Sequence, residues 1–194
     1  MKCYSCPFTG QPFFCLNKLC DIIKSIFQER GDTLLHEYTE KITESLEKKA
    51  NAENAEAQKK YMRDKFEFFG IKASPRRKAT RKFMRKEMRP DYNNLGDIVK
   101  ELWQKDEREY QYFAAELVER YKREFDEDII ALFEYMITHK SWWDTVDQMA
   151  KKLVGYYFKK FPHKKEEYLE KWLQSNNIWL QRSCILFQLA YKED

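Results

Sequence analysis

The sequence predicts an all-α protein with one main core, and two observations lead to this fold class. The 194 residues include only five glycines and five prolines, whereas charged residues make up 35%, a balance that suits long solvated helices better than a turn-rich β architecture. Apolar residues also recur at helical spacing over most of the chain, with short breaks between the runs. With 43% hydrophobic residues, the chain is long enough to bury one core.

An N-terminal extension, residues 1–32, precedes the main run of helices. An apolar face at residues 19–27 predicts a helix within it, and it carries four of the five cysteines, Cys3, Cys6, Cys15 and Cys20. Thiolates at such spacing can close a zinc site, but the second pair has the wrong gap and no recognisable knuckle surrounds it. Reduced thiols are favoured over zinc and, for an intracellular protein, over disulfides. We therefore expect no metal.

A main domain, residues 33–194, follows as a succession of amphipathic helices. The first carries the apolar stripe Leu35, Tyr38, Ile42 and Leu46. The second contains Tyr61 and is expected to run to Phe69, where Gly70 supplies a left-handed turn. A third is expected to start at Ser74 and Pro75, because a hydroxyl caps free N–H groups and proline suits the first helical turn.

The remaining helices are predicted from further apolar stripes. These lie at residues 95–103, 110–121, 129–137, 146–157, 168–172 and 178–189, with Asp106 as the expected cap before the second of them. The helices pair off at roughly 35 to 45 residues, the period of HEAT-type arrays. A curved helical repeat, in which one helix of each pair lines a concave surface, is favoured over a compact bundle, although the period alone does not decide.

Charge is distributed unevenly along the chain. Residues 59–89 hold thirteen Lys and Arg against three acidic residues, a net charge of +10, so the rest of a chain of net charge +4 carries −6. The predicted third helix carries basic residues around little apolar surface and is expected to be exposed; they include Arg76, Arg77, Arg81 and Arg85. Such a block is either a solvated face or a surface for a polyanion.

Several functional classes find no support in the sequence. No stretch approaches the ~20 apolar residues that span a bilayer, and the N-terminus lacks the pattern of a signal peptide. The chain shows no phosphate-binding loop, dinucleotide fingerprint or nucleophile triad. His36, His139 and His163 are too scattered to suggest a metal site. We expect a soluble cytoplasmic protein without a cofactor.

The segment T-H-K-S-W-W-D-T-V-D, residues 138–147, is the most informative for function. Trp143 and Asp147 stand four residues apart, so on a helix they project from one face. An aromatic ring beside a carboxylate on an exposed face suggests a bound ligand. The alternative is that both tryptophans are core and that Asp144 or Asp147 caps the helix. We take Trp142 as core, and both interpretations stay open for Trp143 and Asp147.

A family resemblance rests on four strings in the same order. They are Y-M-R-D-K-F-E-F-F-G-I from Tyr61, E-L-W-Q-K-D-E-R-E-Y-Q from Glu101, S-W-W-D-T-V-D from Ser141, and N-I-W-L-Q-R from Asn177 with I-L-F-Q-L after it. Together they resemble the DNA alkylation repair (AlkD-like) family of HEAT-like DNA glycosylases over residues 33–191.

The resemblance implies a HEAT-like superhelix that grips duplex DNA containing alkylated purines such as 7-methylguanine or 3-methyladenine. By resemblance, Asp147 is the essential carboxylate, Trp143 packs against the lesion-bearing nucleotide, Tyr61 lies at the lesion site and Arg182 serves the DNA backbone. We expect the chain to act as a monomer on chromosomal DNA. Its phosphate contacts would come from Arg182 together with Arg76, Arg77, Arg81 and Arg85.

The chain departs from the family at its C-terminal end. The family continues for further repeats beyond the point that matches Asp194, so a C-terminally shortened array is expected. Its apolar end would be exposed unless a partner or residues 1–32 cover it; the residues concerned are Ile185, Leu189 and Tyr191. A non-catalytic HEAT-like DNA-binding module is therefore the alternative to a glycosylase, and a helical scaffold for a protein partner is the third hypothesis.

Overall fold

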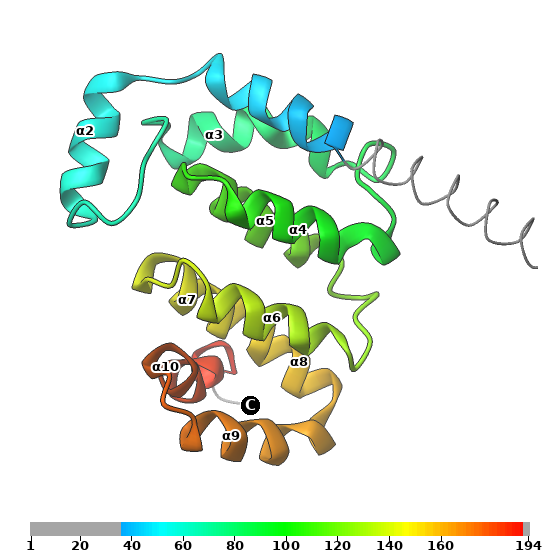
Figure 1. Ribbon diagram of the computed structural model, residues 1–194. Coiled ribbons are helices and arrows are strands. Elements are labelled where there is room, and N and C mark those ends of the chain that lie inside the picture. Colours follow the sequence, from blue (N-terminus) through cyan, green and yellow to red (C-terminus); the bar gives the residue numbers. More distant parts are fainter. Residues whose placement is uncertain (1–35, 192–194) are drawn as a thin grey trace, which may run out of the picture.

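The protein folds as a stack of helix pairs in the computed structural model, which describes residues 36–191 (Figure 1). Within that range the regular structure is helical, and the only β feature is an isolated bridge between Glu67 and Glu107. The predicted all-α fold is confirmed. The cysteines at positions 3–20 and the apolar face at residues 19–27 lie outside the described residues.

The elements follow one another in layers along the stack (Figure 1). The first layer pairs the helical residues 36–47 with α3 (Ala73–Thr80) and the short turn η1 (Arg81–Met84), with α2 (Ala52–Tyr61) at its edge. After η2 (Tyr92–Asn94), the second pairs α4 (Leu95–Gln104) with α5 (Arg108–Arg120). The third pairs α6 (Ile129–Thr138) with a long helix made of α7 (Trp143–Met149), η3 (Ala150–Val154) and α8 (Gly155–Lys160). After η4 (Pro162–Lys164), the last contains α9 (Lys165–Gln174), α10 (Ile178–Leu186) and η5 (Phe187–Ala190).

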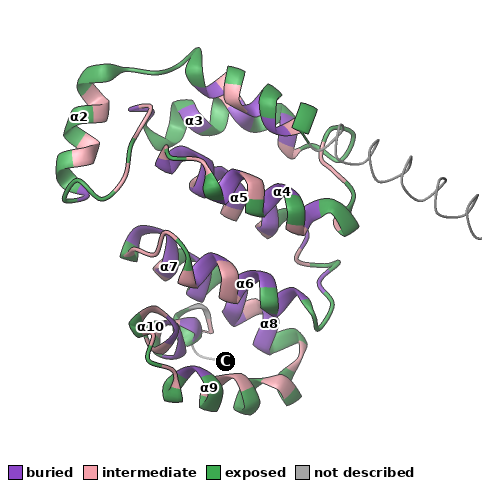
Figure 2. Ribbon diagram, viewed as in Figure 1, coloured by how far each residue is buried: buried purple, intermediate pink, exposed green. Residues whose placement is uncertain are grey.

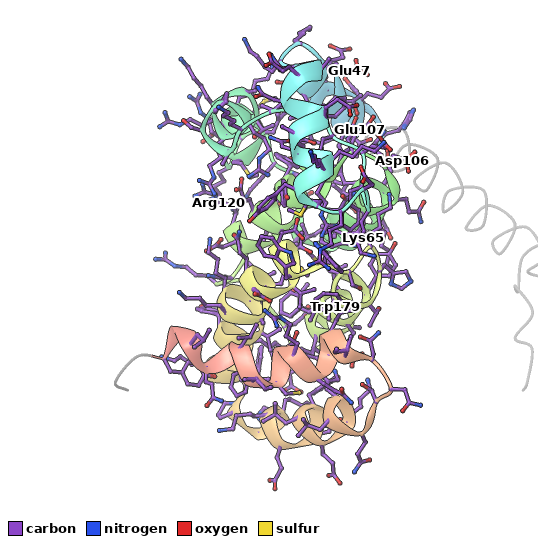
Figure 3. All side chains as sticks on the ribbon, turned by 90° about the vertical axis from the view of Figure 1, so that its left-hand side faces the viewer. Glu47, Lys65, Asp106, Glu107, Arg120 and Trp179 are labelled. Carbon is purple, nitrogen blue, oxygen red and sulfur yellow. The ribbon has the colours of Figure 1, made fainter. Side chains whose placement is uncertain are left out.

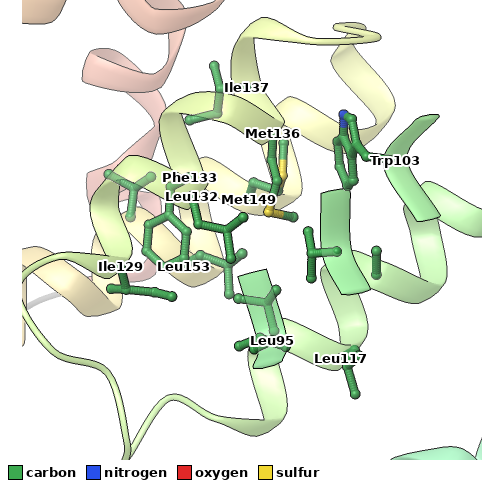
Figure 4. Packing of buried hydrophobic residues seen from close by; sticks show 14 of the residues in the cluster. Leu95, Trp103, Leu117, Ile129, Leu132, Phe133, Met136, Ile137, Met149 and Leu153 are labelled. Atoms are coloured by element: carbon green, nitrogen blue, oxygen red, sulfur yellow. The ribbon is translucent and has the colours of Figure 1, made fainter. Parts of the chain in front are cut away.

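Apolar side chains between the layers form one continuous core. Figure 2 shows that α4 to α8 are largely buried, whereas α2 and α9 are mostly exposed. Figure 4 shows the contact between the second and third layers, where Trp103 faces Met136 and Met149. Each such side chain stabilises the fold by about 1.5–3 kcal/mol when fully buried. The layers are therefore fixed relative to one another by packing.

The second helix ends earlier than the sequence predicts. α2 stops at Tyr61 and not at Phe69, because Arg63 and Asp64 both have left-handed backbone, with φ of 58° and 55°. Gly70 has φ of 80° but lies in the segment that leads to α3. A Cβ there would lie 2.1 Å from the Asn51 carbonyl oxygen, so the glycine allows this segment to pass close to the start of α2.

The predictions for the basic helix also need correction. α3 begins at Ala73 with Lys72 as N-cap and no side-chain capping bond, so Ser74 does not cap it. The helix ends at Thr80 and gives way to η1, after which Arg85 is extended. It is not fully exposed, because Arg76 and Thr80 are buried, and they form an inner face together with the buried Phe83 of η1.

The predicted cap before α5 is wrong. Asp106 does not cap α5, whose N-cap residue is Glu107 without a side-chain capping bond. Before α6 the N-cap residue is Asp128, and the Oδ1 of Asp126 accepts the N–H of Ile129 at 2.9 Å. No helix among residues 36–191 is both long and apolar enough to cross a bilayer.

The last layer leaves apolar side chains exposed on α10 and η5. Ile185 and Leu189 are exposed, as is Ile178. Tyr191 differs from the expectation, because it is half-buried, packs edge-on against Phe187 and donates its hydroxyl to the Gly155 carbonyl at 3.1 Å.

Candidate functional site

The helix α7 presents the predicted tryptophan and carboxylate on one face. Trp142 is the extended N-cap residue, Trp143 begins the helix and Asp147 follows one turn later. The Trp143 residue is 39% exposed and the Asp147 side chain 36%, so neither is core. The sequence predicted Trp142 as a core residue, but it is only half-buried. Its ring packs on the ring of Trp179, with centroids 5.7 Å apart.

Tyr61, at the end of α2, contacts Trp143, at the start of α7. Tyr61 is the last residue of α2 and is 70% exposed. Its ring meets the Trp143 ring edge-on, with centroids 6.0 Å apart and planes at 79°. The last residue of α2 therefore meets the first residue of α7, although the two are 82 positions apart in the chain.

Arg182, on α10, binds the Asp147 carboxylate through two hydrogen bonds. Its Nε donates to Oδ1 at 2.6 Å and its Nη2 to Oδ2 at 2.7 Å. The bond to Asp147 raises the pKa of Arg182. The four predicted residues thus form a row across α2, α7 and α10, which lie on one side of the stack in Figure 1. The four residues that the sequence predicted to lie together form two contacting pairs. Tyr61 contacts Trp143, and Arg182 binds Asp147.

A buried arginine that the sequence did not single out fixes the start of α7. Arg108 is fully buried in the first turn of α5. Its Nε and Nη2 donate to Asp144 at 3.0 and 2.8 Å, and its Nη1 donates to the Lys140 carbonyl at 2.7 Å. The Tyr112 hydroxyl also donates to Asp144, at 2.7 Å. Burial raises the pKa of Tyr112, so it stays a donor.

The same turn of α5 also holds the segment that follows Tyr61. The Glu109 carboxylate accepts the N–H groups of Phe69 and Ile71 at 3.1 and 3.0 Å. Burial raises the pKa of Glu109, and these hydrogen bonds oppose the shift. The Arg108 guanidinium also lies 3.8 Å from the ring centroid of Phe66. One turn of α5 therefore ties the Tyr61 side of the site to the Trp143 side. Arg108 and Glu109 lie within the E-L-W-Q-K-D-E-R-E-Y-Q string, but nothing in its pattern marks them as buried.

A cavity of 320 Å³ lies behind the aromatic pair. Its walls come from α2, α3, α5 and the α7–η3 helix, so it spans three layers of the stack. The lining is mostly apolar and aromatic and includes Tyr61, Phe68, Tyr112, Trp143, Met149 and Leu153. Asp147 is not among the lining residues. The Asp147–Arg182 pair therefore lies outside the lining of this cavity.

A second, larger hollow of 750 Å³ adjoins the cavity and is rich in basic residues. The two share Arg77, Glu116, Glu119 and Lys152 in their linings. The hollow is also lined by Lys78, Arg81, Arg120 and Lys122. In Figure 3, Arg120 lies on one side of α2 and the acidic Asp106 and Glu107 on the other. The basic residues that line the hollow define a basic flank of the molecule, and three of them, Arg120, Lys122 and Lys152, lie outside the basic block at 59–89.

The predicted phosphate-binding arginines do not share one environment. Arg81 and Arg85 are exposed, and Arg77 is exposed while its Nε donates to Glu116 at 2.9 Å. Arg76 is only 4% exposed, donates to Glu116 at 2.9 Å and lies 4.8 Å from the ring centroid of Tyr112. Its burial contradicts the prediction that it contacts phosphate. Among residues 36–191, no group of three His, Cys, Asp or Glu side chains could hold a metal ion.

The fold and the site define a helical-repeat protein with an aromatic and acidic row beside a basic hollow. The family model for the DNA alkylation repair enzyme matches residues 42–194. A solved structure described as a predicted DNA alkylation repair enzyme from Enterococcus faecalis is 27% identical, with a TM-score of 0.67, over 74% of this chain and 67% of that chain. No curated protein matches the chain. The chain belongs to the DNA alkylation repair enzyme family, which confirms the resemblance seen in the sequence.

Proposed function

We propose that the protein is a DNA glycosylase that hydrolyses the N-glycosidic bond of cationic alkylated purines, such as 7-methylguanine and 3-methyladenine, in duplex DNA, at the start of base excision repair. The observation that carries the proposal is the exposed row of Trp143 and Asp147 on α7, flanked by Tyr61 and Arg182. The family supports a role in alkylation repair. We further propose that the chain acts as a monomer inside the cell.

DNA would bind along the basic flank that leads to this row. Arg77 and Arg81 are exposed and line the hollow, and Arg85 is exposed directly after η1. Lys152 lines both the hollow and the cavity beside α7. Contacts between such side chains and phosphates supply most of the sequence-independent affinity for a duplex. The flank would therefore set the register of the duplex against Trp143 and Asp147.

The chemistry follows from the charge that the lesion already carries. A purine alkylated at N7 or N3 is a cation, so the electron pair of its glycosidic bond leaves with the base and no general acid is needed. The sugar is left with oxocarbenium character, and a water oxygen then bonds to its anomeric carbon and gives up a proton to the solvent. The Asp147 carboxylate would stabilise the sugar cation and orient the water. The face of Trp143 would add about 0.5–2 kcal/mol by attraction for the cation.

Arg182 would change partner when DNA binds. Without DNA, both carboxylate oxygens of Asp147 accept hydrogen bonds from Arg182, which neutralises the charge that catalysis requires. An exposed ion pair of this kind is worth only about 0–1 kcal/mol, and a phosphate binds a guanidinium in the same two-pronged geometry. A backbone phosphate would therefore take Arg182 and leave Asp147 free to face the sugar.

Base release from alkylated duplex DNA, measured by chromatography, tests this function. The chain should release 7-methylguanine without added metal. Asp147→Asn keeps the shape but removes the charge, and should lower the rate by ~10²- to 10³-fold. Trp143→Ala should lower it less. Asp97→Asn, an exposed carboxylate on α4, is the matched control and should leave the rate unchanged.

A non-catalytic DNA-binding module is the second candidate, and one observation favours it. Arg182 occupies both oxygens of Asp147, and a pair that persisted on DNA would leave no free carboxylate. Tight DNA binding without base release from the unmodified chain would establish this alternative and reject the glycosylase.

A further inference from the structure

The two adjacent tryptophans at the start of α7 lie in different surroundings. Trp143 lines the cavity together with Tyr61. Trp142 is not among the lining residues of the cavity or of the basic hollow, and its ring packs on the ring of Trp179 with centroids 5.7 Å apart. Trp179 lies on α10 three residues before Arg182, so these two residues are neighbours on the helix surface. The Trp142–Trp179 pair therefore lies beside the predicted row but outside the basic flank.

Lys65 lies over the ring of Trp142. Its Nζ is 4.7 Å from the ring centroid, and Figure 3 shows the residue between the end of α2 and Trp179. Lys65 is exposed, and no carboxylate in the described part of the chain forms an ion pair with it. Lys59 on α2 differs, because its Nζ donates to Glu67 at 2.6 Å. The ring therefore holds the Lys65 ammonium in place and leaves its charge available.

The turn that carries Lys65 is strained and anchored. Arg63 and Asp64, which precede Lys65, have left-handed backbone with φ of 58° and 55°. Non-glycine residues in this conformation persist where the surroundings hold them, and they are frequent at functional sites. Phe66 follows Lys65, and the buried Arg108 guanidinium lies 3.8 Å from its ring centroid. The same guanidinium binds the first turn of α7, so one buried group fixes the strained turn relative to the tryptophan pair.

We propose that Lys65, held over Trp142, binds a backbone phosphate of duplex DNA that the basic flank does not reach, an inference that rests on the proposed function. The basic flank adjoins the cavity that Trp143 lines, and by itself it would hold a duplex from that side alone. Both strands of a duplex carry phosphates along their whole length, and an ammonium binds phosphate as a compact point charge. Phosphate contacts on two sides of Trp143 and Asp147 fix the orientation of the duplex over these residues.

Titration of undamaged duplex DNA at several salt concentrations tests the proposal without depending on catalysis. Lys65→Met removes the charge and should make the slope of log affinity against log salt concentration shallower by about 0.9, the contribution of one phosphate. Lys65→Arg should keep the slope. Lys100→Met, which removes an exposed lysine on α4, is the matched control and should also keep it.

Two further comparisons separate this site from the basic flank and from an ordinary surface lysine. The variant with both Lys65→Met and Arg81→Met should change the slope by about twice the single effect, because two different phosphates are lost. Trp142→Leu should weaken duplex binding by about two- to fivefold in the unmodified chain. It should have no further effect in the Lys65→Met chain, because the ring acts through the lysine.

The outcomes distinguish this inference from the proposed function. An unchanged slope in the Lys65→Met chain, or a double variant with the same slope as Arg81→Met alone, would overturn the inference and leave the glycosylase standing. A shallower slope in the Lys65→Met chain without base release by the unmodified chain would support the phosphate contact and reject the glycosylase. Absence of duplex binding by the unmodified chain would reject both.

Discussion

Two aspartates three residues apart on α7 form the same kind of ion pair in opposite surroundings. Asp144 accepts two hydrogen bonds from Arg108 at 2.8 and 3.0 Å, and Asp147 accepts two from Arg182 at 2.6 and 2.7 Å. The Asp144 and Arg108 side chains are 6% and 0% exposed. The Asp147 and Arg182 side chains are 36% and 43% exposed.

Burial decides what each pair can do. Arg108 has further acceptors in Thr145 and the Lys140 carbonyl, so its donors are satisfied without water and the pair holds α7 against α5. Removing one partner of such a pair leaves an uncompensated buried charge. The Asp147–Arg182 pair is open to solvent, so under the proposed function a phosphate would replace the carboxylate at small cost. The first pair is therefore structural, and the second is available for function.

The largest expected effect comes from breaking the buried pair. Arg108→Met leaves Asp144 buried and unpaired, and should lower the free energy of unfolding by about 3–5 kcal/mol. Arg182→Met, the matched change in the exposed pair, should lower it by less than about 1 kcal/mol. Urea denaturation of both variants measures the difference. Equal losses of unfolding free energy in the two variants would show that burial does not change what the two ion pairs contribute to stability.

The local sequence pattern was sufficient to predict the part of the site that one helix forms. The four-residue spacing of Trp143 and Asp147 predicted a shared face, and α7 confirms it. The pattern could not predict which side chains are buried where an element distant in the sequence covers them. Asp144 and Asp147 are indistinguishable in the string S-W-W-D-T-V-D, because Arg108, which buries Asp144, lies 36 positions away.

The basic block shows the same limit. Arg76 reads like its neighbours in a run of positive charges, but it belongs to a buried stripe with Thr80 and Phe83. That stripe is too polar to be recognised as an inner face, and Glu116 of α5 is what makes its burial tolerable. Likewise, α2 ends at Tyr61 because the backbone of Arg63 and Asp64 is left-handed, which helical periodicity does not reveal.

Exposed and buried arginines should also differ in how much they contribute to the salt dependence of DNA binding. Each phosphate neutralised contributes about −0.9 to the slope of log affinity against log salt concentration. Arg81→Met and Arg182→Met should each make the slope shallower by about that amount, whereas the buried Arg76→Met should leave it unchanged. Titration of duplex DNA at several salt concentrations measures the slopes. A slope near zero for the unmodified chain would remove DNA as the partner and favour the protein scaffold.

The smallest expected effect is the coupling within the exposed pair itself. A double-mutant cycle with Asp147→Asn and Arg182→Met isolates the interaction between the two side chains. Exposed pairs typically give about 0.2–1 kcal/mol in such cycles, even with two short hydrogen bonds, because water competes for both partners and holding the side chains together costs entropy. Urea denaturation of the two single variants and the double variant gives the value. A coupling of several kcal/mol would mean that a phosphate could not displace Asp147 from Arg182, so the carboxylate would stay neutralised on DNA and the route to catalysis through its release would be closed.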